Sequence, residues 1–524
     1  MLNLLTALAL LTPQGPSEKD LFDEVLASIR TTQAADGHYG NGVEDTANVV
    51  IAMALSPRAY RVDDGPFLRD AVQWLLANHA AAAGPELDAR VALALSRAHT
   101  HLYRPTVDVI LARHAWHLED LPQIALGDAE PRGAADILAA IRAEAGVGAM
   151  AAAAARAAIV RTLAHKPKAA PPDVQAIYER GVDFLLAQRS AEGTWEMLGF
   201  PEPGLTAIAV KALLGSERAA VRESAIPALD WLVSLQQEDG SIHGGRVQVY
   251  TTSAAIGALR AGGREQDLPV IARAVEYLKA VQSDGGEGYS ESDKFYGGIG
   301  YGNDLRPDLS NLQYALEAMH EAGVGAEDPA FQRAIFFLQR SQNRRETNTE
   351  VYFDADDVKP IRSGDDGGAV YYPGNSFAGV RAMPDGTRVA ASYGSMTYAL
   401  LKCYTFAGLE GSDARVAAAV EWISAHWTLE VNPGFDMLKD PRAAYQGLYY
   451  YYETLSEALA ALKLDEVVAT GGVRHDWRAE LAATLKAAQR EDGSWINEMA
   501  ERWWEGNPVL CTGYALNALL AARK

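Results

Sequence analysis

Stretches in which apolar residues recur at positions i, i+3, i+4 and i+7 alternate with short turns along most of the chain. This spacing places the apolar side chains on one face of a helix. Several stretches end in a glutamine and an Asp-Gly or Glu-Gly turn, which in most copies leads through an aromatic residue into a second apolar helix. Clear copies begin at Gln33, Gln188, Gln236, Gln282 and Gln489. Because the sequence shows no sustained alternation of period two, it predicts an all-α protein built from helical hairpins.

The hairpins predict a closed ring. A single hairpin cannot bury its apolar face, so neighbouring hairpins must stack on one another. From Val182 onward we count six, with outer helices expected near 178–188, 225–237, 270–282, 329–341, 415–427 and 477–489. Six hairpins close an (α/α)₆ toroid around a central cavity. Residues 167–172 (PKAAPP) predict a linker, which separates this toroid, residues 173–524, from an additional N-terminal helical region, residues 1–172.

The first residues leave two interpretations open. Leu2 to Leu11 form a short apolar run within a signal-like segment, residues 1–14, but no Lys or Arg precedes the run and no clear cleavage site follows it. The run is either an export signal or the apolar face of a first helix. We therefore expect a cytoplasmic or membrane-peripheral protein, with export as the alternative.

Composition and charge narrow the classes of function. Of the 524 residues, 48% are hydrophobic and 22% charged, as in ordinary globular proteins. Asp and Glu number 68 against 47 Lys and Arg, and the net charge of −21 argues against a nucleic-acid partner. With only two cysteines, Cys403 and Cys511, the chain can form neither a disulfide scaffold nor a Cys₄ metal site. We expect no metal and no cofactor.

The repeat resembles that of a known family. Gln489 to Trp495 (QREDGSW) is similar to the QW repeat of squalene–hopene and oxidosqualene cyclases, and the repeats cover about two thirds of the chain. The wider superfamily is the toroid of terpenoid cyclases and protein prenyltransferases. This resemblance implies a class II terpenoid cyclase-like protein acting on an isoprenoid or lipid. In such enzymes an Asp in an Asp-x-Asp-Asp motif protonates the substrate, and aromatic faces stabilise the carbocations that follow.

The motif itself is degenerate in this chain. The segment 300–316 resembles the stretch that contains it, including the preceding proline, Pro307. The four motif positions are occupied by Asp308, Leu309, Ser310 and Asn311. Ser310 stands where the resemblance places the proton donor, and a hydroxyl group cannot protonate an alkene. Asp308 therefore stays as a candidate acid, and Asn311 as a candidate substrate contact.

Two other segments offer acids. Asp354, Asp356 and Asp357 belong to a literal Asp-x-Asp-Asp string in a turn of about 50 residues, and turns of that length are often functional. A solvated acidic loop or a weak Ca²⁺ site is the alternative interpretation of this string. Glu44 and Asp45 resemble the end of the motif in an N-terminal hairpin, where Asp45 could equally cap its helix.

Other enzymes with this toroid fit less well. A protein prenyltransferase needs Asp, Cys and His ligands on one zinc ion, but no such ligands neighbour Cys403 or Cys511 in the sequence. Both cysteines are predicted to be small core residues.

Aromatic residues gather near the turns that lead into the inner helices. They predict a pocket for a flat or elongated ligand, although packing between helices accounts for at least half of them. The candidate substrate contacts are Tyr301, Tyr393, Tyr398, Tyr449, Tyr450, Tyr452, Trp503 and Trp504.

Three functions remain open at this point. The first is acid-initiated cyclisation of an isoprenoid, with Asp356 or Asp308 as the acid. The second is a non-catalytic toroid that binds a lipid or a protein partner, which the loss of the acid at Ser310 favours. The third is carbohydrate chemistry, which needs two carboxylates flanking a glycosidic bond; its candidates are Asp304, Asp308, Glu453, Glu498, Glu501 and Glu505. Peripheral membrane contact and the oligomeric state stay open.

Overall fold

The computed structural model describes residues 17–79, 84–98, 103–114, 116, 118–126, 134–141, 146–164, 173–302, 306–354, 357–383, 386–469 and 474–523. The chain divides into two compact units, Met1–Ala169 and Ala170–Lys524. The apolar run Leu2–Leu11, predicted to be either an export signal or a helix face, lies outside the described residues. None of the helices in the described ranges combines the length and the apolar character needed to cross a bilayer.

The first unit is helical. Its helices are α1 (Glu18–Arg30), α2 (Val43–Leu55), α3 (Pro66–Asn78), α4 (Pro85–Ala98), α5 (Arg104–His114), α6 (Leu121–Leu126), α7 (Ala134–Ala139) and α8 (Val147–Ala164). Helix α2 lies at its centre and is buried along almost its whole length, between α8 and α4. The candidate acid Asp45 sits in the first turn of α2, where its carboxylate accepts a hydrogen bond of 2.8 Å from the backbone N–H of Asn41.

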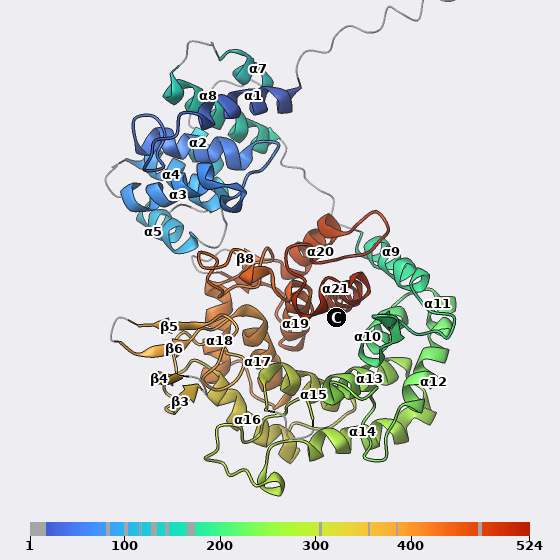
Figure 1. Cartoon of the computed structure of the whole chain (residues 1–524). Helices are drawn as coiled ribbons and strands as arrows, with labels where there is room; N and C mark the ends of the chain where they lie inside the picture. The colour runs from blue at the N-terminus through green and yellow to red at the C-terminus, as the bar shows by residue number, and fades with distance from the viewer. Residues whose placement is uncertain are drawn as a thin grey trace, which may run out of the picture. The chain divides into compact units, whose positions relative to one another are not determined.

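The second unit is a ring of paired helices (Figure 1). The outer helices are α9 (Val174–Ala187), α12 (Ile226–Ser234), α14 (Leu268–Ala280), α16 (Pro329–Ser341), α18 (Ala414–Ala425) and α20 (Trp477–Ala488). The inner helices are α10 (Pro203–Leu214), α13 (Gln248–Gly262), α15 (Leu309–Glu321), α17 (Gly394–Phe406), α19 (Leu448–Ala461) and α21 (Pro508–Ala522). Each outer helix lies within a few residues of its predicted position.

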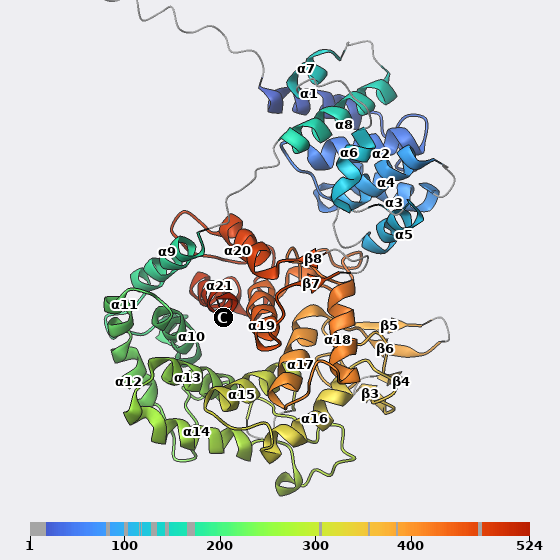
Figure 2. The ribbon, with the colours of Figure 1, turned by 180° about the vertical axis from the view of Figure 1, so that it is seen from behind.

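The inner helices close on themselves. Each packs against the next in chain order, and the last, α21, packs against the first, α10, as Figure 2 shows from behind. Helices α10 and α21 are apolar on nearly all sides, because their faces are covered by the neighbouring inner helices and by the outer ring. The predicted all-α toroid of hairpin repeats is confirmed.

Repeat glutamines join successive pairs of helices. The Gln236 side chain donates to the carbonyl of its own turn residue Gly240, at 3.0 Å, and to Val270 in the first turn of the next outer helix, at 2.8 Å. Gln282 and Gln342 make the same two kinds of contact. The sequence pattern missed Gln342, because its turn glycine follows 25 residues later instead of four.

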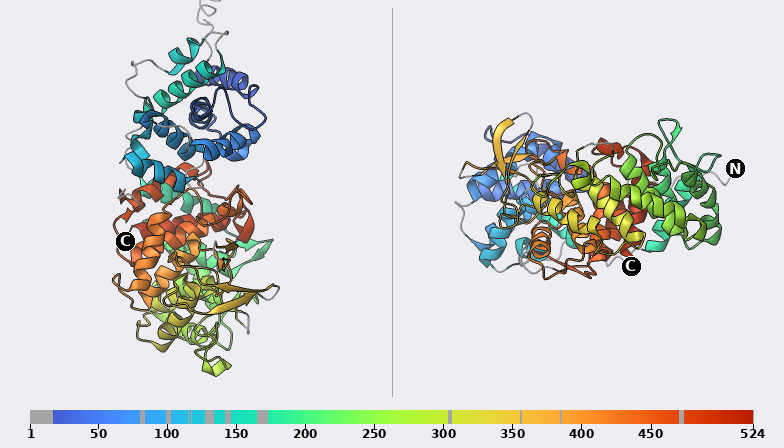
Figure 3. Two further views of the ribbon diagram at one scale, coloured as in Figure 1. Left: turned by 90° about the vertical axis from the view of Figure 1, so that its left-hand side faces the viewer. Right: turned by 90° about the horizontal axis from the view of Figure 1, so that it is seen from below.

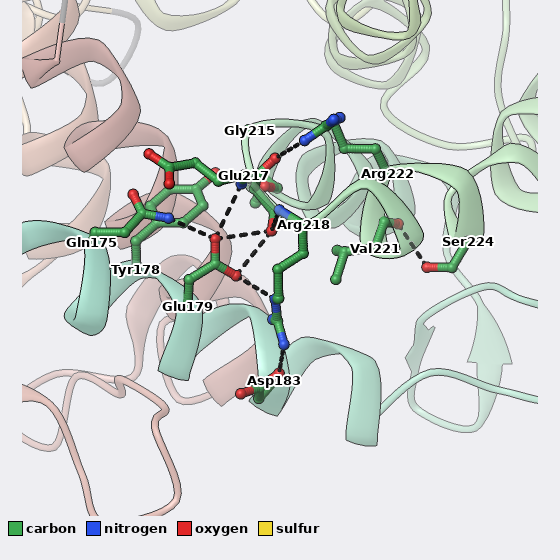
Figure 4. Close-up of polar contacts among 12 residues, drawn as sticks. Gln175, Tyr178, Glu179, Asp183, Gly215, Glu217, Arg218, Val221, Arg222 and Ser224 are labelled. Carbon is green, nitrogen blue, oxygen red and sulfur yellow. Dashed lines mark hydrogen bonds and ion pairs between the residues drawn. The ribbon is translucent and has the colours of Figure 1, made fainter.

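Helix α9 is held by a different contact, which comes from Glu179 and not from the repeat glutamine at the end of this helix, Gln188. The Glu179 carboxylate accepts hydrogen bonds from the Ser216 hydroxyl at 2.9 Å, the Glu217 backbone N–H at 3.1 Å and the Arg218 guanidinium at 2.7 Å (Figure 4). These donors belong to the segment between α10 and α11 (Ala219–Ser224). Glu179 therefore anchors α9 to that segment.

Short strands interrupt the helices, which the all-α pattern did not predict. The long turn between α16 and α17 holds a mixed four-stranded sheet of order β3-β4-β6-β5. Its strands are β3 (Val351–Asp354), β4 (Asp357–Arg362), β5 (Val380–Ala382) and β6 (Arg388–Ala390). Figure 3 shows these strands at the edge of the ring. Two-stranded ribbons form from β1 (Glu196–Met197) and β2 (Phe200–Pro201), and from β7 (Val467–Val468) and β8 (Arg474–His475).

Candidate active site

A cavity of about 500 Å³ lies inside the second unit. Its lining residues on the inner helices all belong to the first two turns of those helices, so six helix N-termini surround it. The rest of the lining comes from segments that precede inner helices, such as Tyr301, Tyr371 and Trp503. The volume falls within the range of small-molecule sites, which is roughly 300–1,000 Å³.

Tyrosines dominate the wall of this cavity. Apolar side chains such as Leu205, Ile208 and Phe377 fill the space between their rings. The lining tyrosines are Tyr250, Tyr301, Tyr314, Tyr371, Tyr393, Tyr450 and Tyr514. Such a wall offers broad apolar faces together with several hydroxyl groups, which suits an elongated ligand with a polar end.

The structure brings together five of the aromatic residues singled out in the sequence, namely Tyr301, Tyr393, Tyr450, Trp503 and Trp504. The other three are absent from the described lining. Tyr452 donates to the carbonyl of Leu429 at 2.6 Å, Tyr449 packs on Tyr452, and Tyr398 packs on Tyr451. Consecutive positions on a helix differ by about 100°, so of the four tyrosines 449–452 only Tyr450 faces the cavity.

Sequence reasoning missed Tyr250, Tyr314 and Tyr514. The signal that would have found two of them is helical spacing. Tyr314 follows Ser310 by four residues on α15, and Tyr514 follows Leu510 by four residues on α21. Side chains four apart share one face of a helix.

Ser310 lies on the cavity wall and is held by two tyrosines. Tyr250 Oη donates to Ser310 Oγ at 2.5 Å, and Ser310 Oγ is 2.9 Å from Tyr450 Oη. Gln313 donates a further bond of 3.3 Å to Tyr450 Oη. The position expected to hold a strong acid therefore holds a chain of neutral hydroxyl groups, which can bind an oxygen atom of a ligand.

Asp308 lies directly behind this wall and is fully buried. It begins helix α15, where one carboxylate oxygen accepts from the backbone N–H of Asn311 and the other from the Asn311 side chain, both at 2.9 Å. Burial raises the pKa of Asp308 to about 6, while the contacts with Asn311 and Tyr371 and the charge of Arg306 oppose the rise. Asp308 thus holds a proton at mildly acidic pH.

Two tyrosines separate Asp308 from the cavity. The hydroxyls of Tyr301 and Tyr371 are 3.1 Å apart, and both rings line the cavity. The Tyr371 hydroxyl also interacts with the Asp308 carboxyl group. Asn311, predicted as a substrate contact, is fully buried against Asp308 and is not on the described lining.

Two carboxylates reach the described lining, and both hold helix N-termini. Glu202 accepts from the backbone N–H of Leu205 at the start of α10. Glu505 accepts from the backbone N–H of Tyr450 at 2.9 Å and from the side chain of Asn497 at 2.7 Å. Burial raises the pKa of Glu505 to about 7, although these hydrogen bonds oppose the rise.

A cluster of charged side chains lies among the inner helices, next to the cavity. The Lys402 ammonium is fully buried and lies 2.9 Å from Glu317 and 2.7 Å from Glu457. Glu453 accepts from Tyr314 at 3.2 Å and from Asn517 at 3.1 Å, so it connects the cavity wall to this cluster. Burial raises the pKa of Glu453 well above its ordinary value.

Only the first and last residues of the literal Asp-x-Asp-Asp string are described. Asp354 ends β3 and pairs with Asp357, which begins β4. Asp356 lies outside the described residues, as does Asp304. The described lining of the cavity comes from other segments. Cys403 and Cys511 are buried, and burial raises the pKa of both thiols, as expected of core residues.

Residues 197–359 match the family model of the squalene–hopene cyclase C-terminal domain. This segment contains the Asp308–Asn311 stretch, and the match confirms the predicted resemblance to that superfamily. A search of curated proteins found no match.

Several solved structures are similar at low identity. The type II terpene cyclase MstE from Scytonema is 15% identical over 67% of this chain and 98% of its own, with a TM-score of 0.39. A variant of MstE in complex with its substrate geranylgeranyl dihydroxybenzoate is 14% identical over 67% of this chain and 97% of its own, with a TM-score of 0.40. A protein from Actinoplanes is 18% identical over 67% of this chain and 100% of its own, with a TM-score of 0.37.

Proposed function

We propose that this toroid is a class II terpenoid cyclase-like enzyme, which folds an isoprenoid inside its tyrosine-lined cavity and starts ring closure by protonation. The observation that supports it best is the state of Asp308. This carboxyl group occupies the first position of the family's acid motif, is fully buried, and has a pKa raised to about 6. A general acid works best when its pKa lies near the working pH.

The proton reaches the substrate through Tyr371. In this relay Asp308 is the acid and the Tyr371 hydroxyl only passes the proton on: as the Asp308 carboxyl group gives its proton to Tyr371 Oη, the hydroxyl proton of Tyr371 passes to the substrate, so that no tyrosinate forms. The net result is a protonated substrate and an Asp308 carboxylate. Asn311 stabilises this carboxylate through its backbone N–H and its side-chain amide, and Arg306 contributes a positive charge. The aromatic wall then faces the carbocation, which favours cation–π attraction.

The test is product formation by the purified full-length chain from squalene, oxidosqualene and geranylgeranyl diphosphate, followed by mass spectrometry. We expect a cyclic product from at least one substrate. Asp308→Asn keeps an oxygen that can cap α15 but removes the acid, so it should lower the rate by roughly 10²- to 10⁴-fold. Asp173→Asn is the matched control, because Asp173 caps the outer helix α9 through the backbone N–H of Ala176 and is not on the described lining of the cavity; it should retain product.

The literal Asp-x-Asp-Asp string, residues 354–357, is the alternative source of the proton. Asp356→Asn, measured in the same assay, separates the two. Loss of product in this variant, with product retained in Asp308→Asn, would assign the acid to this string.

A non-catalytic toroid is the second candidate function. The hydroxyl chain of Tyr250, Ser310 and Tyr450 favours it, because it binds oxygen without supplying a strong acid. Binding of an isoprenoid without turnover would support this second function. Carbohydrate hydrolysis receives less support, because both carboxylates on the described lining, Glu202 and Glu505, are engaged at helix N-termini.

A further inference from the structure

Four aromatic rings form a continuous arc along one side of the cavity. Successive ring centroids lie 5.8 Å apart between Tyr372 and Tyr371, 4.5 Å between Tyr371 and Phe377, and 5.1 Å between Phe377 and Trp503. Tyr371, Phe377 and Trp503 line the cavity. We call these four residues the aromatic arc.

A guanidinium group stacks on each end of the aromatic arc. Arg306 lies 3.9 Å from the ring centroid of Tyr372, and Arg502 lies 4.8 Å from that of Trp503. Arg502 also lies 4.9 Å from the centroid of Phe377. Arg306 also lies 5.5 Å from the centroid of Tyr371, so both cations lie over rings that line the cavity, a geometry that arginine favours.

Neither cation is in direct ion-pair contact with a carboxylate among the described residues. Arg502 donates to the side-chain oxygen of Gln446 at 2.9 Å, and neither Arg502 nor Arg306 forms an ion pair in this part of the chain. The contrast is notable in a chain with 68 acidic against 47 basic residues. A guanidinium that lies over an aromatic ring keeps its N–H donors in its own plane, where they point away from the ring and are available to an anion.

Both charges act on groups of the cavity. The positive charge of Arg502 opposes the rise in the pKa of buried Tyr393, and that of Arg306 opposes the rise in the pKa of Asp308. The inner helices add to this potential, since their N-termini, the positive ends of the helix dipoles, surround the cavity. Glu202 and Glu505 are the carboxylates on the described lining, and each is engaged at such a helix terminus.

The backbone that presents Arg502 is strained. Trp503 and Trp504 adopt φ values of 58° and 68°, in the left-handed region that residues other than glycine seldom occupy. A Cβ atom on Gly447 would lie 3.0 Å from the Trp503 ring, so this glycine makes room for the indole. Strain of this kind is found where the surrounding structure enforces it, commonly at binding sites.

We propose that Arg306, Arg502 and the aromatic arc form a head-group subsite, and that the substrate is an isoprenoid ending in an anionic oxygen group, a carboxylate or a diphosphate. The inference rests on the proposed isoprenoid function and names its substrate class. The anion binds at one of the two guanidinium groups and is attracted by the charge of the other, the isoprene units next to it lie against the arc, and the rest of the hydrocarbon chain extends among the tyrosines.

The test compares three ligands that share one C₂₀ chain and differ in the head group: geranylgeraniol, geranylgeranoic acid and geranylgeranyl diphosphate. Binding to the purified full-length chain is measured through tryptophan fluorescence. We expect the two anions to bind at least about 10-fold more tightly than the alcohol, and the difference to shrink as salt is added. Carboxylate and diphosphate are distinguished by which of the two binds more tightly.

The double variant Arg306→Gln/Arg502→Gln should remove the advantage of the anions and leave the affinity for the alcohol unchanged. Arg340→Gln is the matched control, because Arg340 lies 6.0 Å from the ring centroid of Phe336 on an outer helix and does not contact the cavity. Equal affinity for all three ligands in the native protein, or an equal loss for all three in the double variant, would overturn the subsite while leaving isoprenoid binding in place. Failure of all three ligands to bind would overturn both the subsite and the proposed function.

Discussion

The Gln489 side chain donates a hydrogen bond of 3.0 Å to the backbone carbonyl of Ile177, a residue 312 positions earlier in the chain. The same amide donates to Gly493 in its own turn, also at 3.0 Å. Gln489 ends the last outer helix, and Ile177 lies in the first turn of the first one. This side chain therefore joins the last hairpin of the toroid to the first.

Replacing Gln489 by Ala should destabilise the ring, because two partly buried hydrogen bonds are lost and their carbonyl acceptors stay in place. A loss of about 1–3 kcal/mol in the free energy of unfolding is expected. Urea denaturation followed by tryptophan fluorescence measures it, since Trp495 packs in the same turn and is fully buried. Gln188→Ala is the control, because Gln188 ends α9 and is exposed. Equal midpoints for the two variants would show that the Gln489 contact contributes nothing to closure.

Lys402, in the charged cluster among the inner helices, offers a second test of stability. Its removal in Lys402→Met leaves Glu317 and Glu457 buried without their cation. Breaking a buried pair in this way costs about 3–5 kcal/mol, whereas an exposed pair contributes about 0–1 kcal/mol. Arg474→Met, which breaks the exposed pair with Glu466, is the control.

Chemical denaturation of both variants checks the expectation. Adding Glu457→Gln to Lys402→Met should recover part of the lost stability, because one buried carboxylate becomes neutral. If Lys402→Met lowers the free energy of unfolding no more than Arg474→Met does, the buried cluster does not stabilise the ring of inner helices.

The raised pKa of Glu505 predicts that the free energy of unfolding depends on pH. Burial raises its pKa to about 7 from an ordinary value of 4.5, so the folded state holds the proton over a range in which the unfolded state releases it. The stability that this proton provides is complete below pH 4.5 and is lost as the pH rises to about 7. At about 1.36 kcal/mol per pKa unit, the difference amounts to about 3 kcal/mol.

Glu505→Gln cannot ionise and should lack this loss. Measured by urea denaturation at intervals from pH 4 to pH 8, the native protein should lose stability relative to the variant as the pH rises. Parallel curves for the two proteins would mean that the pKa of Glu505 is not raised in the folded state.

The sequence predicted the ring but only part of the site. Helical periodicity and the Gln-x-x-Asp-Gly turns specify local hairpins, and the burial of their apolar faces dictates the stacking, so the outer helices could be placed within a few residues. The cavity wall depends instead on which side of each inner helix faces the axis. This rotation is set by packing among six helices, which is why Tyr450 could not be separated from its neighbours Tyr449 and Tyr452. Phe377, which packs on Tyr371, meets Trp503 only through a tertiary contact between distant turns.

The surroundings of Gly447 predict that one added methyl group at this position changes the shape of the cavity, because Gly447 and Trp503 both line it. Its φ of +66° strains any side chain, and an added Cβ would also meet the Trp503 ring at 3.0 Å. Gly263 is a matched control, since its φ is +63° and nothing lies within 4 Å of its added Cβ. Both alanine variants should lose about 1 kcal/mol of stability from backbone strain. Only Gly447→Ala should also displace Trp503, and with it Arg502, so only this variant should weaken the binding of geranylgeranyl diphosphate. Unchanged binding in Gly447→Ala, at a stability matched to Gly263→Ala, would show that the position of Trp503 does not determine how the ligand is held.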